Sequence, residues 1–162
     1  MVIRSAVPDD ALAVATVHVR AWQHGFKDLL PADYLAKLQP AERAQRYTFG
    51  ITDGSKPQTL VALIDDAIVG FATTGIVEGE ALLYALYVDP DRWGSGVGRA
   101  LIVEAKKDLR KTGKREAFLW SMVGNTRADR FYTADGWQLT GEAKVEQVWG
   151  TAVHEQRYRC AL

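Results

Sequence analysis

Residues 86–101 read LYVDPDRWGSGVGRAL and carry glycine at three alternate positions, Gly94, Gly96 and Gly98. The run that ends in this stretch, residues 80–88, is apolar on both of its alternating faces, which is typical of a strand buried on both sides of a sheet. After the glycines, apolar residues recur every four positions from Val97 to Leu109, as they do in an amphipathic helix. The sequence therefore predicts a tight turn that joins a buried central strand to a helix.

The glycine turn also has a chemical interpretation. Alternate glycines let successive backbone N–H groups converge, and the positive end of the helix dipole adds to them, so the turn favours an anion such as a pyrophosphate. Arg92 and Arg99 can add positive charge, although glycine can also serve a turn through backbone freedom alone. A Walker P-loop is excluded because no lysine follows the glycines. A dinucleotide fingerprint is excluded because Arg99 stands three positions after Gly96.

The rest of the chain alternates between strand and helix patterns. Strands are expected at residues 2–7, 59–64, 67–74, 80–88 and 116–122, with two more within 137–159 that separate near 149–151. Helices are expected from Pro8 to Trp22 and at residues 34–38, 41–49, 97–109 and 126–134. The short link Asp65-Asp66 suits an antiparallel hairpin, whereas strands 80–88 and 116–122 are expected to pair in parallel through a right-handed crossover. This order predicts a mixed α+β sheet within one domain, residues 1–162.

Composition and charge narrow the classes of function. The chain has 20 Lys+Arg and 20 Asp+Glu, so no overall charge draws it to nucleic acid or anionic lipid. Its one cysteine, Cys160, cannot form an intramolecular disulfide, and no cysteine cluster suggests a metal site. No segment approaches the roughly 20 apolar residues of a membrane span. We expect a cytoplasmic protein without a metal and without a nucleic-acid or membrane partner.

Two segments together resemble a known family. Residues 86–90 running into 94–101 resemble motif A of the GNAT superfamily, the acetyl-CoA-dependent N-acetyltransferases. A second segment resembles motif B of that superfamily through Asn125, Ala128, Phe131, Tyr132, Gly136 and Trp137. One position departs from the pattern, because Trp93 stands where the superfamily has Gln or Arg. The resemblance implies α/β/α layers with a seven-stranded, mostly antiparallel, splayed sheet flanked by about four helices.

The resemblance also implies acetyl-CoA as co-substrate, with its pantetheine between the parted strands 80–88 and 116–122. The residues implied in cofactor binding are Leu86, Tyr87, Val88, Trp93, Gly94, Ser95, Gly96, Val97, Gly98, Arg99 and Asn125. Backbone donors from Gly94 to Gly98 do not depend on the side chain of Trp93. Asn125 has a second interpretation as an ordinary helix N-cap, and both roles are compatible.

For catalysis, the resemblance implies that Tyr132 is the general acid that protonates the CoA thiolate, although a core tyrosine would fit the same pattern. Glu80 is the first candidate for the general base because it shares strand parity with Tyr84. A solvated carboxylate at a strand start is the simpler interpretation, and Glu78 and His24 are further candidates for the base.

The acceptor side is implied to lie between the first two helices, at Trp22, His24 and Phe26, although Trp22 and Phe26 also suit a hydrophobic helix-end contact. The expected acceptor is a small-molecule or peptide amine. The late aromatic residues Trp137, Trp149 and Tyr158 fit either a homodimer surface or core packing.

The leading hypothesis is direct attack of the amine on acetyl-CoA in a ternary complex. The alternatives are a non-catalytic acyl-CoA-binding module and an acyltransferase that uses a longer acyl-CoA.

Overall fold

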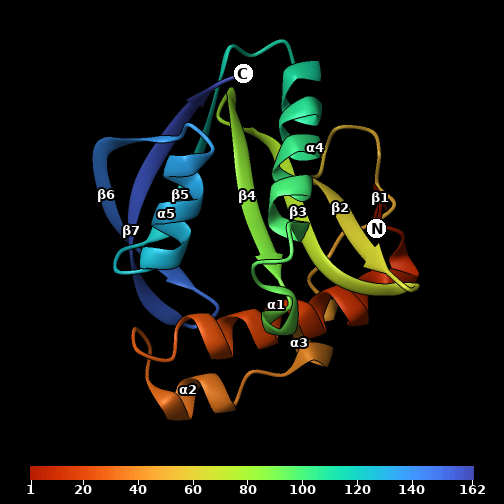
Figure 1. Ribbon diagram of the computed structural model, residues 1–162, viewed down its shortest axis with the longest axis vertical. Helices are drawn as coiled ribbons and strands as arrows, with labels where there is room; N and C mark the ends of the chain where they lie inside the picture. The colour runs from red at the N-terminus through yellow and green to blue at the C-terminus, as the bar shows by residue number, and fades with distance from the viewer.

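Seven strands form one mixed sheet in the computed structural model, which describes residues 1–162 (Figure 1). They are β1 (Val2–Ser5), β2 (Gln58–Ile64), β3 (Ala67–Val77), β4 (Glu80–Val88), β5 (Glu116–Met122), β6 (Gln138–Val148) and β7 (Thr151–Ala161). Their spatial order is β1-β2-β3-β4-β5-β7-β6. Every neighbouring pair is antiparallel except β4 and β5, which are parallel. The predicted seven-stranded, mostly antiparallel sheet is confirmed.

Helices cover both faces of this sheet. They are α1 (Ala11–Gly25), α2 (Ala32–Ala36), α3 (Pro40–Ala44), α4 (Val97–Lys111) and α5 (Thr126–Ala134), with 3₁₀ turns η1 (Pro8–Asp10) and η2 (Pro90–Arg92). In Figure 1, α4 lies over β3 and β4, and α1 crosses the lower ends of the strands. The helix predicted at 41–49 is too long, since α3 ends at Ala44. Beyond it, Tyr47 and Phe49 stack on each other and pack against the α1 side of the sheet.

Close packing of α4 on the sheet depends on Gly70 of β3. A Cβ atom at this position would lie 3.0 Å from Cδ1 of Leu101 and 3.1 Å from the carbonyl oxygen of Tyr87, too close without a shift of one partner. The predicted apolar stripe of α4 faces this contact, and Val97, Leu101 and Leu109 are almost fully buried. Because Val97 at the start of α4 and Tyr87 near the end of β4 both lie against Gly70, the start of the helix lies beside the end of β4.

A β-bulge interrupts β4 at Tyr84. Leu83 and Ala85 pair with adjacent residues of β3, so Tyr84 has no partner there. Because the bulge inserts one residue, the side chains change faces across it. The α4 face carries Ala81 and Leu83 before the bulge and Leu86 and Val88 after it. The strict alternation expected along residues 80–88 is therefore wrong beyond Leu83.

The sheet opens between β4 and β5. The two strands pair at only two positions, Ala81 with Ala117 and Leu82 with Phe118, and then diverge (Figure 1). The edge of β4 that faces β5 has no strand partner from Leu83 to Val88. The splayed sheet implied by the resemblance is present, and its open end lies next to α1 and the glycine turn.

The late aromatic residues belong mainly to the interior. Trp137 and Tyr158 are 1% and 2% exposed and pack in the main core with α4. Core packing therefore explains these two side chains, and the predicted homodimer has no support from them. No helix is long and apolar enough to cross a membrane.

Candidate functional site

The turn between β4 and α4 presents a row of free backbone donors. Gly94 and Gly96 adopt left-handed φ values of 77° and 89°, which favour glycine, and Gly96 caps α4. In the turn, Ser95 N donates to the carbonyl oxygen of Arg92 at 3.3 Å. The N–H groups that find no acceptor in the chain are those of Gly94, Gly96, Val97, Gly98 and Arg99. Together with the helix dipole, they form a site for an anion.

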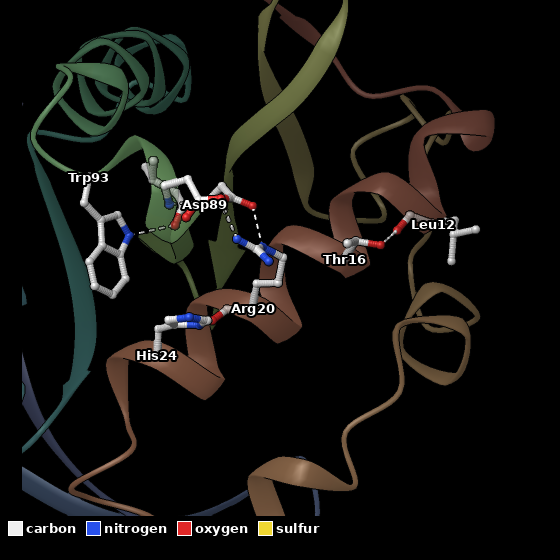
Figure 2. A network of polar contacts seen from close by, with 8 residues as sticks. Leu12, Thr16, Arg20, His24, Asp89 and Trp93 are labelled. Carbon is white, nitrogen blue, oxygen red and sulfur yellow. Dashed lines mark hydrogen bonds and ion pairs between the residues drawn. The ribbon is translucent and has the colours of Figure 1, made fainter.

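Helix α1 and the end of β4 hold this turn in place (Figure 2). From α1, Arg20 donates to both carboxylate oxygens of Asp89, at 2.8 and 3.2 Å, and to Asp91 at 2.9 Å. The Asp89 carboxylate also accepts from the backbone N–H of Asp91, so Asp89 caps the start of η2. Trp93 donates its indole N–H to the carbonyl oxygen of Val88 at 2.8 Å. These contacts of Asp89 and Trp93 thus fix the path of the chain into the glycine turn without a ligand.

A cleft that we call the loop cavity, of about 460 Å³, runs along this turn into the opening of the sheet. Its lining is Ala21, Gly25, Phe26, Leu86, Tyr87, Val88, Arg92, Trp93, Gly94, Gly96, Gly98, Arg99, Asn125, Arg127, Ala128, Phe131 and Tyr132. Three arginines and no carboxylate contribute to it, so the cavity favours an anionic ligand. The predicted residues Ser95 and Val97 are not among its lining residues. The Ser95 hydroxyl donates to the carbonyl oxygen of Arg92, and Val97 is buried but contributes a free N–H.

Arg127 is the part of this cavity that sequence reasoning missed. Its guanidinium carbon lies 3.3 Å from the ring centroid of Trp93, a stacked cation–π contact. Burial lowers the pKa of Arg127 from its ordinary value, and no carboxylate pairs with this side chain. Trp93, the departure from the superfamily pattern, is therefore a platform that holds a cation from α5 in the cavity. The only sequence signal was the position of Arg127, two residues after Asn125.

Tyr132 lies where the loop cavity meets a second cavity. Its ring packs in the core, with centroids 5.3 Å from Phe131, 5.9 Å from Tyr158 and 6.1 Å from Trp137. Its hydroxyl makes no hydrogen bond within the chain and is not among the fully buried unpaired polar atoms, so it is a free donor that remains accessible. Burial raises the pKa of Tyr132 well above its ordinary value, so the phenol stays protonated. The core interpretation thus applies to this residue, and its role as general acid stays a prediction.

The second cavity, the junction cavity, has a volume of about 190 Å³. Its lining is Trp22, Phe26, Leu83, Tyr84, Ala85, Leu86, Tyr87, Trp120, Ser121, Met122, Asn125, Tyr132, Val148, Val153 and Glu155. Glu155 of β7 is the only charged residue among them, and its carboxylate has neither an ion pair nor a hydrogen bond. Burial raises the pKa of Glu155 above its ordinary value. Its sequence signal was weak, a carboxylate two residues after the buried Val153 on the same strand face.

The predicted acceptor residues divide into two groups. Trp22 and Phe26 are buried, and both line the junction cavity, with Phe26 also lining the loop cavity. Their ring centroids lie 5.1 Å apart, so the expected hydrophobic contact is present as well. His24 instead lies on the exposed side of α1, where Nδ1 is 2.9 Å from the carbonyl oxygen of Arg20 (Figure 2). The structure does not bring His24 to either cavity.

Asn125 and Glu80, two further predicted residues, also differ in placement. Asn125 lines both cavities, and its side chain caps α5 by accepting from the N–H of Ala128 at 3.3 Å. Glu80 is exposed and forms an ion pair with Arg157. It lies roughly 20 Å along β4 from Leu86 and lines neither cavity. Glu80 as general base therefore stays a prediction without support from its position.

No group of three or more His, Cys, Asp or Glu side chains is placed to hold a metal ion. The two cavities follow the opening between β4 and β5 and have aromatic walls. The loop cavity holds the free amides and three arginines, the junction cavity holds a carboxylate, and Tyr132 lines both. The chemical capacity of this site is to bind an elongated anion and to donate and accept protons at the inner end.

Comparison with known proteins agrees with this geometry. The acetyltransferase (GNAT) family matches residues 19–137. The uncharacterized N-acetyltransferase YuaI of Bacillus subtilis is 29% identical over 129 residues, 76% of this chain and 72% of that protein. The ribosomal protein bS18-alanine N-acetyltransferase of Escherichia coli is 30% identical over 109 residues, 67% of this chain and 74% of that protein. The PaiA N-acetyltransferase of Thermoplasma acidophilum, solved in complex with coenzyme A, has the same fold, with a TM-score of 0.70 over 96% of both chains at 22% identity.

Proposed function

This chain belongs to the GNAT family of acetyltransferases, and from that premise we propose that it transfers the acetyl group of acetyl-CoA to a primary amine by direct attack in a ternary complex. The observation that carries the proposal is the row of unpaired N–H groups from Gly94 to Arg99, which opens into a cavity that ends at Tyr132. The acceptor is a small-molecule or peptide amine. The E. coli relative, whose substrate is a protein alanine, and the coenzyme A complex of the T. acidophilum protein support this class of reaction.

The residues present fit acetyl-CoA, which supplies an acetyl group activated as a thioester. The free amides of the glycine turn bind a diphosphate, and Arg92, Arg99 and Arg127 offset its charge. The unpaired edge of β4 from Leu83 to Val88 can hydrogen-bond the amides of a pantetheine chain as a missing strand would. A free backbone N–H of this edge is also the donor we assign to the charge that develops on the carbonyl oxygen.

Tyr132 is the proton donor in this proposal. The proposal is supported by its hydroxyl, which makes no hydrogen bond within the chain, and by its position in the lining of both cavities. As the C–N bond forms and the C–S bond breaks, Tyr132 donates to the sulfur. The acceptor ammonium loses two protons in the net reaction. One of them replaces the proton that Tyr132 gave to the sulfur, and the other leaves to solvent. The phenol is thereby regenerated at the end of each turnover.

We assign the base to Glu155 instead of Glu80. An amine must lose a proton before it can attack, and Glu155 is the only carboxylate that lines the junction cavity. Its raised pKa makes it a better proton acceptor than a free carboxylate, because a more basic group takes a proton more readily. Glu80 is held in an ion pair with Arg157 outside the cavities.

The pair of variants Glu155→Gln and Glu80→Gln tests this assignment. Glu155→Gln should lower kcat/KM roughly 100-fold and abolish the fall of the rate on the acid side of the pH profile. That fall should lie above the usual pKa of a glutamate, since the pKa of Glu155 is raised. Glu80→Gln is the matched control and should keep both the rate and the profile. A larger loss in Glu80→Gln than in Glu155→Gln would return the base to Glu80.

The function itself is tested in two steps. Calorimetry with coenzyme A measures binding, and Gly96→Ala should weaken it because Gly96 needs its left-handed φ of 89° to aim the amides. Thiol release from acetyl-CoA is then followed with a library of primary amines. Tight binding of coenzyme A with no release from any amine would favour a non-catalytic acyl-CoA-binding module. Faster release from a longer acyl-CoA than from acetyl-CoA would favour an acyltransferase of different chain length. Absence of coenzyme A binding would refute the proposal.

A further inference from the structure

A third cavity, which we call the arginine cavity, lies on the α1 face of the sheet and has a volume of about 400 Å³. Its lining residues come from α1, from α3 and the chain after it, from β2, β3 and β4, and from the turn between β6 and β7. Its charged lining residues are Arg43, Arg46 and Lys56, and no carboxylate lines it. An anion would therefore find three cations and no competing acidic side chain there.

Arg43 is a half-buried cation without a counterion. It takes part in no ion pair, although ten pairs occupy other arginines and lysines of the chain, and its buried Nε has no hydrogen-bond partner. Its guanidinium carbon lies 4.9 Å from the ring centroid of Trp149 and 5.6 Å from that of Tyr47. A buried donor without an acceptor costs stability, and a ligand that supplied the acceptor would offset this cost.

The neighbours of Arg43 add no negative charge. Burial, followed by the charge of Arg43, lowers the pKa of His18 well below its ordinary value, so this histidine is neutral. Its Nδ1 lies 3.0 Å from the hydroxyl of Tyr47, whose pKa burial raises to about 12. Trp149 holds a left-handed φ of 52°, and Tyr34 donates to its carbonyl oxygen at 2.5 Å. The aromatic wall is thus fixed in place around an uncompensated guanidinium.

The arginine cavity adjoins the junction cavity around the β4 bulge. The two share Trp22, Tyr84, Ala85, Tyr87 and Val148 as lining residues. Beyond this shared wall, the junction cavity holds one carboxylate, Glu155, and the arginine cavity holds only cations. A molecule that spans both cavities would place a positive end near Glu155 and a negative end near Arg43, with an apolar body between aromatic rings.

We propose that the acceptor is an amine that also carries an anionic group, a carboxylate or a phosphate, and that Arg43 binds this group in the arginine cavity. This inference rests on the proposed function and names its substrate class. Arg43 is the specificity-determining residue, since its planar guanidinium suits two-point contact with a carboxylate or phosphate. The amine end then faces Glu155 and Tyr132 in the junction cavity.

The test uses probes matched in size. The α-amino acids and the ω-amino acids from glycine to 6-aminohexanoate are each compared with their carboxamides, which keep the amine and lose the anion. Aminoalkylphosphonates of the same lengths form a separate arm that distinguishes a phosphate from a carboxylate. Thiol release from acetyl-CoA gives kcat and KM, and calorimetry on the protein saturated with coenzyme A gives binding without turnover.

We expect at least one anionic amine to have a kcat/KM about tenfold or more above that of its neutral partner, which for an amino acid is the carboxamide. Arg43→Gln should remove this advantage through KM while leaving the neutral partner within about twofold, and Arg43→Lys should keep part of it. The unchanged rate of the neutral partner then reports that the variant is folded. Lys37→Gln, which removes an exposed cation that lines none of the three cavities, is the matched control and should keep the full advantage.

The outcomes separate the two proposals. Equal rates for anionic and neutral amines, or an equal loss of both in Arg43→Gln, would overturn the anion site and leave acetyl transfer intact. Anionic amines that bind through Arg43 in calorimetry without thiol release would keep the anion site, and acetyl transfer would be overturned if the broader amine library also gave no release. A panel that is neither acetylated nor bound would overturn the anion site, while coenzyme A binding and the broader amine library decide acetyl transfer separately.

Discussion

Replacing Tyr132 with phenylalanine removes one hydroxyl and leaves the ring contacts with Phe131, Trp137 and Tyr158 in place. Since this hydroxyl makes no hydrogen bond within the chain, its loss strands no partner, and the free energy of unfolding should change by no more than about 0.5 kcal/mol. Removal of a general acid typically lowers the rate by roughly 10²- to 10⁴-fold. That loss equals about 2.7 to 5.5 kcal/mol in the activation barrier. Tyr132→Phe should therefore separate catalysis from stability.

The assay is thiol release from acetyl-CoA with an amine that the wild type accepts, together with calorimetry for coenzyme A and a denaturant melt. Tyr158→Phe is the matched control, because the Tyr158 hydroxyl donates to the Asp129 carboxylate at 2.8 Å. This variant should lose roughly 1–3 kcal/mol of stability and keep its turnover. The reasoning fails if Tyr132→Phe retains more than about a tenth of kcat, or if its affinity for coenzyme A falls as much as its rate.

Three further predictions concern the loop, the core and the cavity. Gly96→Ala should lower the free energy of unfolding by about 1–2 kcal/mol in a denaturant melt, because its φ of 89° is left-handed, whereas Gly98→Ala, at a helical position, should not destabilise the chain. In the folded chain, the pKa of His18 lies well below its ordinary value. Below about pH 6.5 the unfolded chain therefore binds a proton at His18 that the folded chain does not. The free energy of unfolding should then fall by up to about 1.4 kcal/mol for each pH unit. Melts across pH should show this slope in wild type and in His24→Gln but a weaker slope in His18→Gln, and an unchanged slope in His18→Gln would contradict the assignment. Arg127→Gln should weaken coenzyme A binding roughly 10- to 100-fold in calorimetry and reduce its salt dependence, and wild-type affinity in this variant would exclude Arg127 from the site.

The sequence predicted the features that depend on short-range patterns. The glycine turn, the strand before it and the helix after it follow from periodicity and from residues that permit left-handed backbone, all of which lie in one unbroken stretch of sequence, residues 80–109. The cap at Asn125 and the hairpin at Asp65-Asp66 are local in the same way. For these features, the neighbours along the chain are also the neighbours in space.

The side chains that line the cavities could not be assigned in this way, because their placement depends on strand register. A bulge at Tyr84 changes the faces of β4, and no local pattern marks the extra residue. Glu80 was chosen because it shares strand parity with Tyr84, but its carboxylate pairs with Arg157 of β7, a strand that begins 71 residues after Glu80 in the sequence. The same strand brings Glu155 to the junction cavity.

By itself, then, the sequence determined the order of the elements and the glycine turn with its free amides, since backbone amides are positioned by local conformation whatever lies around them. Only the tertiary structure decided which charged side chains face the cavities, among them Arg127 stacked on Trp93, Glu155 in the junction cavity and Arg43 over Trp149. The physical reason is that burial and the absence of a counterion arise from packing between distant segments, and these two conditions turn an ordinary charge into a binding or catalytic group.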